Sequence, residues 1–205
     1  MAHQFSTLTF TDDVAEVQRE MGSRPANEKL TERGPQNDTF GPHEKAFITA
    51  RDGFYLSTVG KTGWPYVQFR GGPTGFLRVL DDRTLAYADI TGNRQYITTG
   101  NLRSNHRASL FLMDYPNQTR LKILGTVEVT PWSKAPDWKN DLLIPDRSRP
   151  ERAVLIHLAA FDWNCPQNIP QRWTIEELHQ TPLFDRIRSL EQEVKDLRAK
   201  LAKTS

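Results

Sequence analysis

The sequence predicts a mainly β protein of the α+β class, in which a small antiparallel barrel is flanked by helices. Short alternating runs, separated by turn clusters such as Gly60-Lys61-Thr62-Gly63 and Gly71-Gly72-Pro73, form the pattern of an antiparallel meander. Such a meander can curl into a barrel, which removes exposed strand edges. At 205 residues the chain is long enough for one domain of about 150 residues plus extensions. The predicted strands are Phe54–Val59, Tyr66–Arg70, Phe76–Leu80, Thr84–Ile90, Ala108–Met113, Arg120–Val129 and Ala153–Phe161.

The even charge balance and the lack of long apolar runs argue against nucleic acid and membrane partners. The chain carries 27 Lys and Arg against 25 Asp and Glu, a net charge of +2. Residues 183–205 hold six of the basic and four of the acidic side chains, so the remainder is electrically neutral. A balance this even argues against nucleic acid binding. No run approaches the roughly 18 apolar residues of a membrane span, and no leader pattern opens the chain, so we expect no membrane partner and a cytoplasmic location.

The sequence shows no metal or nucleophile motif. Cys165 is the single cysteine, so it forms no intrachain disulfide and makes a cysteine-rich metal site impossible. It has no basic neighbour, which indicates an inert thiol. The histidines at 43, 106, 157 and 179 lack metal-ligand spacing. We therefore predict no metal site, and the sequence leaves the catalytic residues unknown.

Two helices are expected before the first strand. Val14, Val17 and Met21 have helical spacing within Thr11–Met21, which predicts a small helix packed on the barrel. The polar stretch Gly22–Gly41, punctuated by proline and glycine, is expected to be a long surface segment. A second helix is predicted over 42–51, with proline in its first turn.

The strand Tyr66–Arg70 is the first candidate for a binding surface. A period of two places Tyr66, Gln68 and Arg70 on one face, with Val67 and Phe69 on the other. The first face is polar enough to hold a ligand. An arginine at a strand end commonly faces water, but the two glycines that follow permit a sharp bend and close approach of a bound group, so both interpretations of Arg70 stay open.

A second candidate follows the strand Thr84–Ile90. A short helix is expected over Asn93–Asn101, with Ile97 and Leu102 as inward anchors. If Asn93 lies at its N-terminus, free backbone N–H groups and the positive end of the helix dipole point the same way as Arg94, a favourable geometry for a phosphate. The alternative is an ordinary capped helix without a ligand.

The remaining chain is expected to alternate between strand and helix. Residues 131–142 should be helical, and the segment Phe161–Trp173 is too rich in Pro, Asn and Gln for regular structure. Its aromatic side chains either pin the segment to the barrel or supply stacking walls for a flat ligand.

A heptad pattern occupies the last predicted helix, Thr181–Lys203. In a parallel pair, Arg186 would face Glu191 of a second chain and Glu193 would face Arg198, so both pairs attract. The alternative is an amphipathic helix lying on its own barrel, although the apolar stripe is narrower than such helices usually show. The apolar positions are Ile187, Val194 and Leu201 at a, with Phe184, Leu190 and Leu197 at d.

Four segments together resemble the pyridoxamine 5′-phosphate oxidase-related family, the FMN-binding split β-barrel flavoproteins. The similarity runs from about Pro42 to Trp173. The resemblance divides the chain into an N-terminal helix and surface segment (1–41), an FMN-binding split β-barrel domain (42–180) and a C-terminal coiled-coil-like helix (181–205). The segments that carry it are Gly63–Gly72, Tyr87–Gln95, Gly125–Glu128 and Asn164–Arg172.

The resemblance implies a homodimer with FMN at the subunit interface. Gln68 and Arg70 fall beside the flavin and its phosphate, and Asn93 and Arg94 fall on the family's phosphate-binding pair. Arg120 falls where a polar side chain approaches the cofactor across the interface, and 163–172 resembles the segment that closes over the flavin. The implied cofactor-binding residues are Gln68, Arg70, Asp89, Asn93, Arg94, Gln95, Arg120, Trp163, Gln167 and Arg172.

The implied function is that of an FMN-dependent oxidoreductase that accepts hydride from an unidentified small-molecule donor. The oxidase that makes pyridoxal phosphate ends in an arginine- and histidine-bearing motif that grips its substrate, and Asn164–Arg172 replaces that motif here. We therefore expect no authentic pyridoxine phosphate oxidase. The alternatives are a flavin carrier or sensor without a substrate, or a barrel that holds haem or a deazaflavin.

Overall fold

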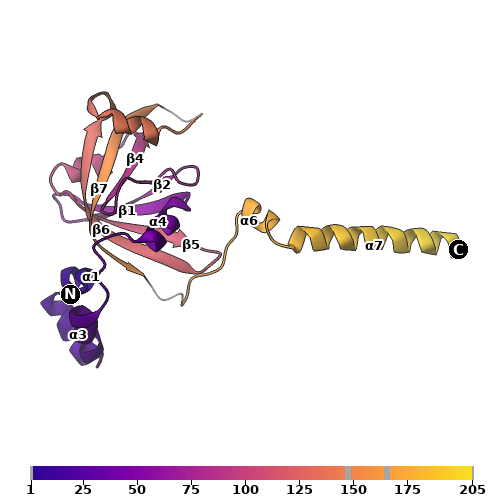
Figure 1. Ribbon diagram of the computed structural model, residues 1–205, viewed down its shortest axis with the longest axis horizontal. Coiled ribbons are helices and arrows are strands. Elements are labelled where there is room, and N and C mark those ends of the chain that lie inside the picture. The colour runs from indigo at the N-terminus through magenta and orange to yellow at the C-terminus, as the bar shows by residue number, and fades with distance from the viewer. Residues whose placement is uncertain (1, 146–148, 164–166, 205) are drawn as a thin grey trace. The chain divides into compact units, whose positions relative to one another are not determined.

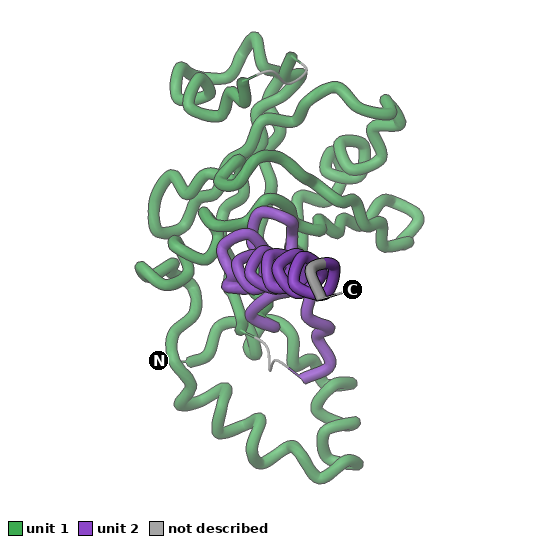
Figure 2. The backbone as a smooth tube through the Cα atoms, turned by 90° about the vertical axis from the view of Figure 1, so that its right-hand side faces the viewer, with its two compact units in different colours: residues 1–114, 119–166 green, residues 115–118, 167–205 purple. Residues whose placement is uncertain are grey.

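The computed structural model describes residues 2–145, 149–163 and 167–204. Two compact units are present: Met1–Asp114 with Thr119–Pro166, and Tyr115–Gln118 with Gln167–Ser205 (Figure 2). The first unit holds the sheet and the helices that precede it, and the second holds the two C-terminal helices. Within the described ranges, no helix combines the length and hydropathy needed to cross a membrane.

The first unit is built on one seven-stranded antiparallel sheet with flanking helices, which confirms the predicted fold class (Figure 1). The strand order is β2-β1-β5-β6-β7-β4-β3. The predicted strand Phe76–Leu80 was too long, because only two of its residues pair with β4. The strands are β1 (Gly53–Val59), β2 (Pro65–Gly71), β3 (Arg78–Val79), β4 (Thr84–Ile90), β5 (Arg107–Asp114), β6 (Thr119–Pro131) and β7 (Pro150–Trp163).

The core follows from strand alternation. On β1, Phe54 and Leu56 are almost completely buried, and their cross-strand neighbours on β5 and β6 complete the inner face of the sheet. β4 is buried on both faces, in keeping with its run of apolar side chains. Each fully buried leucine or phenylalanine contributes about 1.5–3 kcal/mol through burial, so this face dominates the stability of the unit.

Four helices precede the sheet: α1 (Gln4–Thr9), α2 (Asp12–Glu20), α3 (Arg24–Arg33) and α4 (Pro42–Thr49). α1 was not predicted, and α3 replaces half of the expected surface segment. Pro25 does not break α3, because a proline in the first turn lacks only an N–H that would be unpaired there. The prediction that α2 packs its apolar face on the barrel was wrong, since Val17 and Met21 are exposed.

Two later helix predictions also need correction. α5 (Ile97–Leu102) begins four residues after the expected start, and Ile97 is exposed whereas Leu102 is buried as predicted. The expected helix over 131–142 is two 3₁₀ turns, η1 (Trp132–Lys134) and η2 (Asp137–Leu142). Pro136 separates them, because it offers no N–H to continue a helical ladder.

The second unit contains α6 (Ile175–His179) and α7 (Leu183–Thr204). Thr174 caps α6: its hydroxyl accepts from the Glu177 N–H, and the Glu177 carboxylate accepts from the Thr174 N–H. α6 was not predicted. α7 confirms the predicted C-terminal helix and runs without interruption over 22 residues (Figure 1).

Candidate functional site

A small polar cavity lies between β2, the end of β4 and the loop that leads into α5. Its volume is about 140 Å³. The cavity brings together side chains that are distant in the sequence, including an arginine of β7. The predicted site residues that line it are Gln68, Arg70, Asp89, Asn93, Arg94 and Gln95.

β2 supplies one wall of the cavity through its polar face. Tyr66, Gln68 and Arg70 are half-buried and line the cavity, whereas Val67 and Phe69 on the other face are 58% and 54% exposed. The Tyr66 hydroxyl donates to the Gln68 side-chain oxygen at 2.5 Å. Arg70 Nε is buried and has no hydrogen-bond partner among the described residues. A buried cationic donor without a partner is costly, so an acceptor at this position would relieve that cost.

β4 and β7 supply the second wall through an ion pair. Asp89 is 8% exposed, and one of its carboxylate oxygens accepts from Arg152 Nε at 2.7 Å. The other oxygen lies 3.9 Å from an Arg70 terminal nitrogen. Arg152 also pairs with Glu151 at 2.6 Å. Burial opposes the charged form, but the Asp89 and Glu151 carboxylates raise the pKa of Arg152 above its ordinary value.

Sequence reasoning missed Arg152. It lies directly opposite Asp89 in the β4–β7 ladder, and its guanidinium lies 4.9 Å from the centre of the Tyr96 ring. The sequence does contain a signal for the inward position of Arg152. The period of two that buries Val154 and Ile156 extends back to Arg152 and places all three on one face. The expected start of the last strand at Ala153 left Arg152 in a loop.

The loop before α5 supplies the third wall. The Asn93 side-chain oxygen accepts from the Gln95 backbone N–H at 3.1 Å, a local turn that competes with helix formation. Arg94 and Tyr96 have φ angles of 60° and 53°, in the left-handed region that costs a non-glycine residue about 1–3 kcal/mol. The expected helix N-terminus at Asn93 is therefore wrong: Asn93 and Arg94 reach the cavity from a bend ahead of the helix.

The cavity is electropositive. Its lining contains Arg70, Arg94 and Arg152 against Asp89, and Glu151 pairs with Arg152 from beside the lining, which leaves one net positive charge. Behind Arg70, burial raises the pKa of Tyr87 to about 12, so this phenol stays neutral and adds no negative charge. The arrangement suits a dianionic group that accepts several charge-assisted hydrogen bonds.

Arg120 and Trp163 do not line the cavity. Arg120 lies over the Phe111 ring at 5.5 Å, and its Nε is buried without a hydrogen-bond partner among the described residues. Trp163 is the last residue of β7, where its Nε1 donates to the Glu44 carboxylate at 2.8 Å. Burial opposes ionisation of Glu44, but the bond from Trp163 and backbone N–H groups lower the pKa of this carboxyl.

Gln167 and Arg172 belong to the second unit. There, the Arg172 guanidinium lies 5.1 Å from the centre of the Tyr115 ring, and the Gln118 side chain donates to the Ile169 carbonyl at 2.6 Å. The start of the motif Asn164–Arg172, including Cys165, lies outside the described residues.

Comparisons with known proteins identify the family of the chain. The family model described as pyridoxamine 5′-phosphate oxidase matches residues 40–160, which include the whole sheet except the end of β7. A comparison with curated proteins gave no match.

Several solved structures are similar in fold. The HupZ protein of Group A Streptococcus is 18% identical, with a TM-score of 0.48 over 65% of this chain and 99% of its own. A putative pyridoxamine 5′-phosphate oxidase from Lactobacillus delbrueckii is 22% identical, with a TM-score of 0.47 over 61% and 94%. An FMN-binding protein from Syntrophomonas wolfei is 12% identical, with a TM-score of 0.44 over 73% and 96%.

Proposed function

The chain belongs to the pyridoxamine 5′-phosphate oxidase family, and on that premise we propose that it is a flavoprotein that binds FMN through its phosphate. The observation that carries the proposal is the convergence of Arg70, Arg94 and Arg152 on one cavity, in which Arg70 Nε has no partner among the described residues. The net positive charge of this group favours an anion, and charge-assisted hydrogen bonds to phosphate are strong.

The size of the cavity determines which part of the cofactor it can hold. Pockets that enclose a whole small molecule measure roughly 300–1,000 Å³. At about 140 Å³, this cavity has room for the phosphate and the adjoining chain, so the flavin ring would lie outside it. A ring in that position needs cover from another surface, which supports a homodimer with FMN at the subunit interface.

The outer face of the sheet offers such a surface. Tyr55 and Phe69 lie opposite each other on β1 and β2, and both are exposed. Arg120 lies on this same face, next to Phe111, in keeping with a role across the interface. The assignments of Trp163, Gln167 and Arg172 to the flavin site rest on the sequence resemblance.

The proposed activity is oxidoreduction with an unidentified small-molecule donor. FMN supplies hydride-accepting chemistry when it is bound. The side chains bind and orient: Arg70 and Arg94 neutralise the phosphate, and Gln68 donates a hydrogen bond toward the ring. Because 164–172 departs from the substrate-gripping motif of the B6 oxidase, we propose that pyridoxine phosphate is not the substrate. A flavin carrier or sensor is the alternative.

The absorption spectrum of the purified protein tests the proposal. We expect a yellow protein from which heat releases FMN, and apoprotein that binds FMN more tightly than riboflavin. Equal affinity for the two would contradict the phosphate site. Bleaching by NADH or NADPH without oxygen supports the oxidoreductase, whereas a flavin that no nicotinamide reduces favours the carrier.

A steady-state assay in air tests the proposal that pyridoxine phosphate is not a substrate. Pyridoxine phosphate turnover of about 1 s⁻¹ or faster, within the ordinary range of enzymes, would contradict it.

A further inference from the structure

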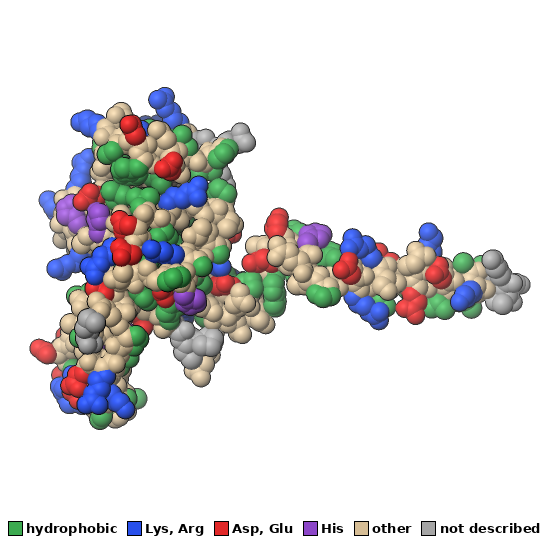
Figure 3. Space-filling view, viewed as in Figure 1, with side chains coloured by type: hydrophobic (Ala, Val, Ile, Leu, Met, Phe, Trp, Pro, Cys, Tyr) green, Lys and Arg blue, Asp and Glu red, His purple; other side chains and the backbone are tan. Residues whose placement is uncertain are grey.

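The C-terminal helix α7 presents a continuous apolar stripe to solvent. The five residues of the stripe have exposed fractions that rise from 40% at Ile187 to 67% at Leu201. Basic and acidic side chains are spread along the helix beside the stripe (Figure 3). A helix of 22 residues is about 33 Å long, so the stripe is a long, narrow apolar surface. The residues of the stripe are Ile187, Leu190, Val194, Leu197 and Leu201.

The junction between α6 and α7 lies at the N-terminal end of this stripe. Phe184 was expected at a d position, but it lies six residues before Leu190 and therefore at an e position, where it stacks on His179 of α6 with ring centres 4.2 Å apart. The preceding d position is Leu183, the first residue of α7, which is 49% exposed. The five residues from Ile187 onward form the stripe within the body of the helix.

The residue types along the stripe favour a two-stranded assembly. Ile187 and Val194 are β-branched and occupy a positions, whereas Leu190 and Leu197 occupy d positions. This combination favours parallel dimers over trimers or tetramers, because each side chain shape suits the packing geometry of its layer in a dimer.

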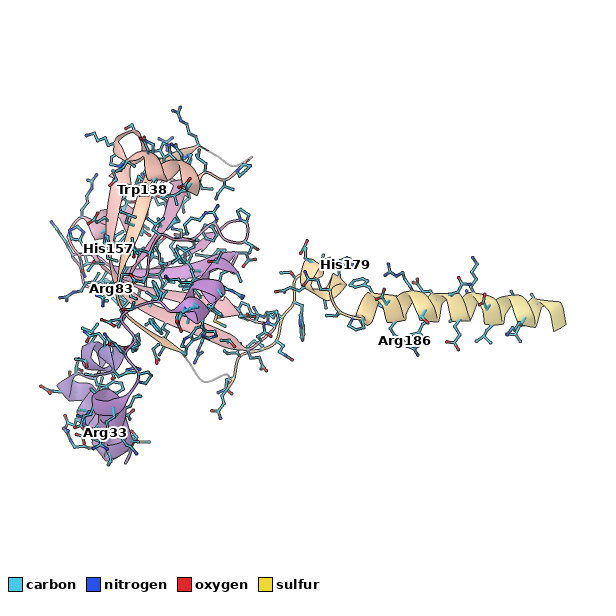
Figure 4. The ribbon with its side chains drawn as sticks, in the orientation of Figure 1. Arg33, Arg83, Trp138, His157, His179 and Arg186 are labelled. Atoms are coloured by element: carbon cyan, nitrogen blue, oxygen red, sulfur yellow. The ribbon has the colours of Figure 1, made fainter. Side chains whose placement is uncertain are left out.

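The charges beside the stripe lack partners within the helix. Among the described residues, Arg186, Glu191, Glu193 and Arg198 make no ion pair, although Asp185 and Arg188 pair on the same helix. Arg186 projects from the helix surface (Figure 4). Side chains at g and e positions of this kind form ion pairs between helices and set the orientation of the partner.

From these observations we infer that α7 pairs with α7 of a second copy of this chain in a parallel, two-stranded coiled coil. In that register all five apolar layers meet their own counterparts. Arg186 faces Glu191 of the partner subunit, and Glu193 faces Arg198 of the partner subunit. Each contact occurs twice by symmetry, so all four flanking pairs attract.

An antiparallel partner fits less well. In the register that places Leu201 opposite Leu183 of the partner subunit, Glu193 lies beside Glu193 of the partner subunit and Arg186 lies beside Lys200 of the partner subunit. Like charges in these positions are destabilising. A shift by one heptad removes this repulsion, but it also takes Ile187 out of the apolar seam.

Three heptads form a weak coil by themselves, because short helices are marginal in water. Pairing therefore depends on a high local concentration of the two tails, which a dimer of the first unit would supply. This inference concerns α7 alone and does not require bound flavin.

Disulfide trapping in the full chain tests the inference. On a Cys165→Ser background, Ile187→Cys and Leu201→Cys place one thiol near each end of the seam, and Ala199→Cys places one on the opposite, outward face as a matched control. Since a disulfide requires Cα atoms within about 7 Å, we expect both seam variants to form linked dimers about tenfold or more faster than the control. Non-reducing electrophoresis measures the rates.

Three results would overturn the inference. Equal rates for the seam and control variants, or no linked dimer from either seam variant, would show that α7 has no such partner. Coexpression of Ile187→Cys with a size-tagged Leu197→Cys chain tests orientation, because these two positions face each other in the first antiparallel register. Mixed disulfides in place of homodimeric ones would show an antiparallel pair. Neither disulfide measurement depends on bound flavin.

Discussion

Two rows of side chains cross the same five strands on opposite faces of the sheet, and they end differently. The inner row starts at the cavity with Arg70 and passes through side chains that are almost completely buried. It ends at Trp163, which hydrogen-bonds to α4. The row is Arg70, Phe54, Leu112, Leu121 and Trp163.

The outer row is covered at one end only. Lys122 pairs with Asp162 at 2.7 Å and lies 4.7 Å from the centre of the Phe5 ring, so α1 covers that end. At the other end, Tyr55 and Phe69 contact each other and remain exposed. Phe111 lies between the two ends.

At β2 the usual arrangement of a one-sided sheet is reversed, because the polar residues face inward and the apolar residues face outward. Under the proposed function, a ligand with negative charge accounts for the inward arginine. A second subunit accounts for the outward Val67 and Phe69, because it would cover them. The two faces of one short strand thus indicate two different partners, and separate mutations can test each.

The largest effect is expected on the outer face. The double variant Val67→Asp and Phe69→Asp should weaken self-association by about 2 kcal/mol or more, roughly 30-fold, since buried interface aromatics contribute on this scale. The monomer should still fold, because both side chains are more than half exposed in it. Sedimentation velocity over a range of concentrations measures the change.

Thr62→Asp in the β1–β2 turn adds a charge to the same hairpin away from the aromatic pair and serves as the control. A double variant that sediments as a dimer at the wild-type concentration would show that the exposed aromatics are ordinary surface.

On the inner face, Arg94→Ala should weaken FMN binding by about 1.5–3 kcal/mol, the contribution of one hydrogen bond to a charged group. Riboflavin affinity should not change, because riboflavin lacks the phosphate. Fluorescence titration of the apoprotein measures both. Arg107→Ala, an exposed arginine on β5 outside the cavity, is the matched control. Equal losses for FMN and riboflavin would contradict the assigned role of Arg94.

The sequence predicted those features that depend on local periodicity. The two faces of β2 follow from its period of two. Arg70 was proposed from its strand end, and Asn93 and Arg94 were proposed from an expected helix N-terminus that lies four residues further on. The structure brings the three to one cavity.

Features set by long-range pairing or by local competition were not predicted. Arg152 joins Asp89 through the register of β4 on β7, which no local pattern contains. The late start of α5 reflects the Asn93 turn and the left-handed Tyr96, which the period of the apolar residues does not reveal. α3 was missed because Pro25 was interpreted as a loop residue, although it occupies a first helical turn.

Truncation after Gln180 tests whether the outer face of the sheet is enough to hold two subunits together without α7. We expect the shortened chain to remain dimeric and to bind flavin, with a melting temperature lower by about 2–4 °C if the tail contributes about 1 kcal/mol. Sedimentation and thermal melts at matched concentrations measure this. A monomeric product would show that the tail, and not the exposed face of β1 and β2, is the main contact.

The smallest effect is expected at the far end of the inner row, where Glu44 accepts the Trp163 hydrogen bond. Hydrogen bonds lower the pKa of the Glu44 carboxyl below the ordinary value of 4.5. A lowered pKa in the folded state stabilises the protein above the unfolded-state pKa, and this contribution is lost as the pH falls through the folded-state value. Glu44→Gln should therefore cost about 1 kcal/mol of unfolding free energy at neutral pH, because glutamine keeps the shape but loses the charge. The difference from wild type should shrink as the pH is lowered below 4.5. Urea unfolding at several pH values measures it, with Glu20→Gln on the exposed face of α2 as the control. A difference that stays constant with pH would show that shape, and not charge, holds Trp163 against α4.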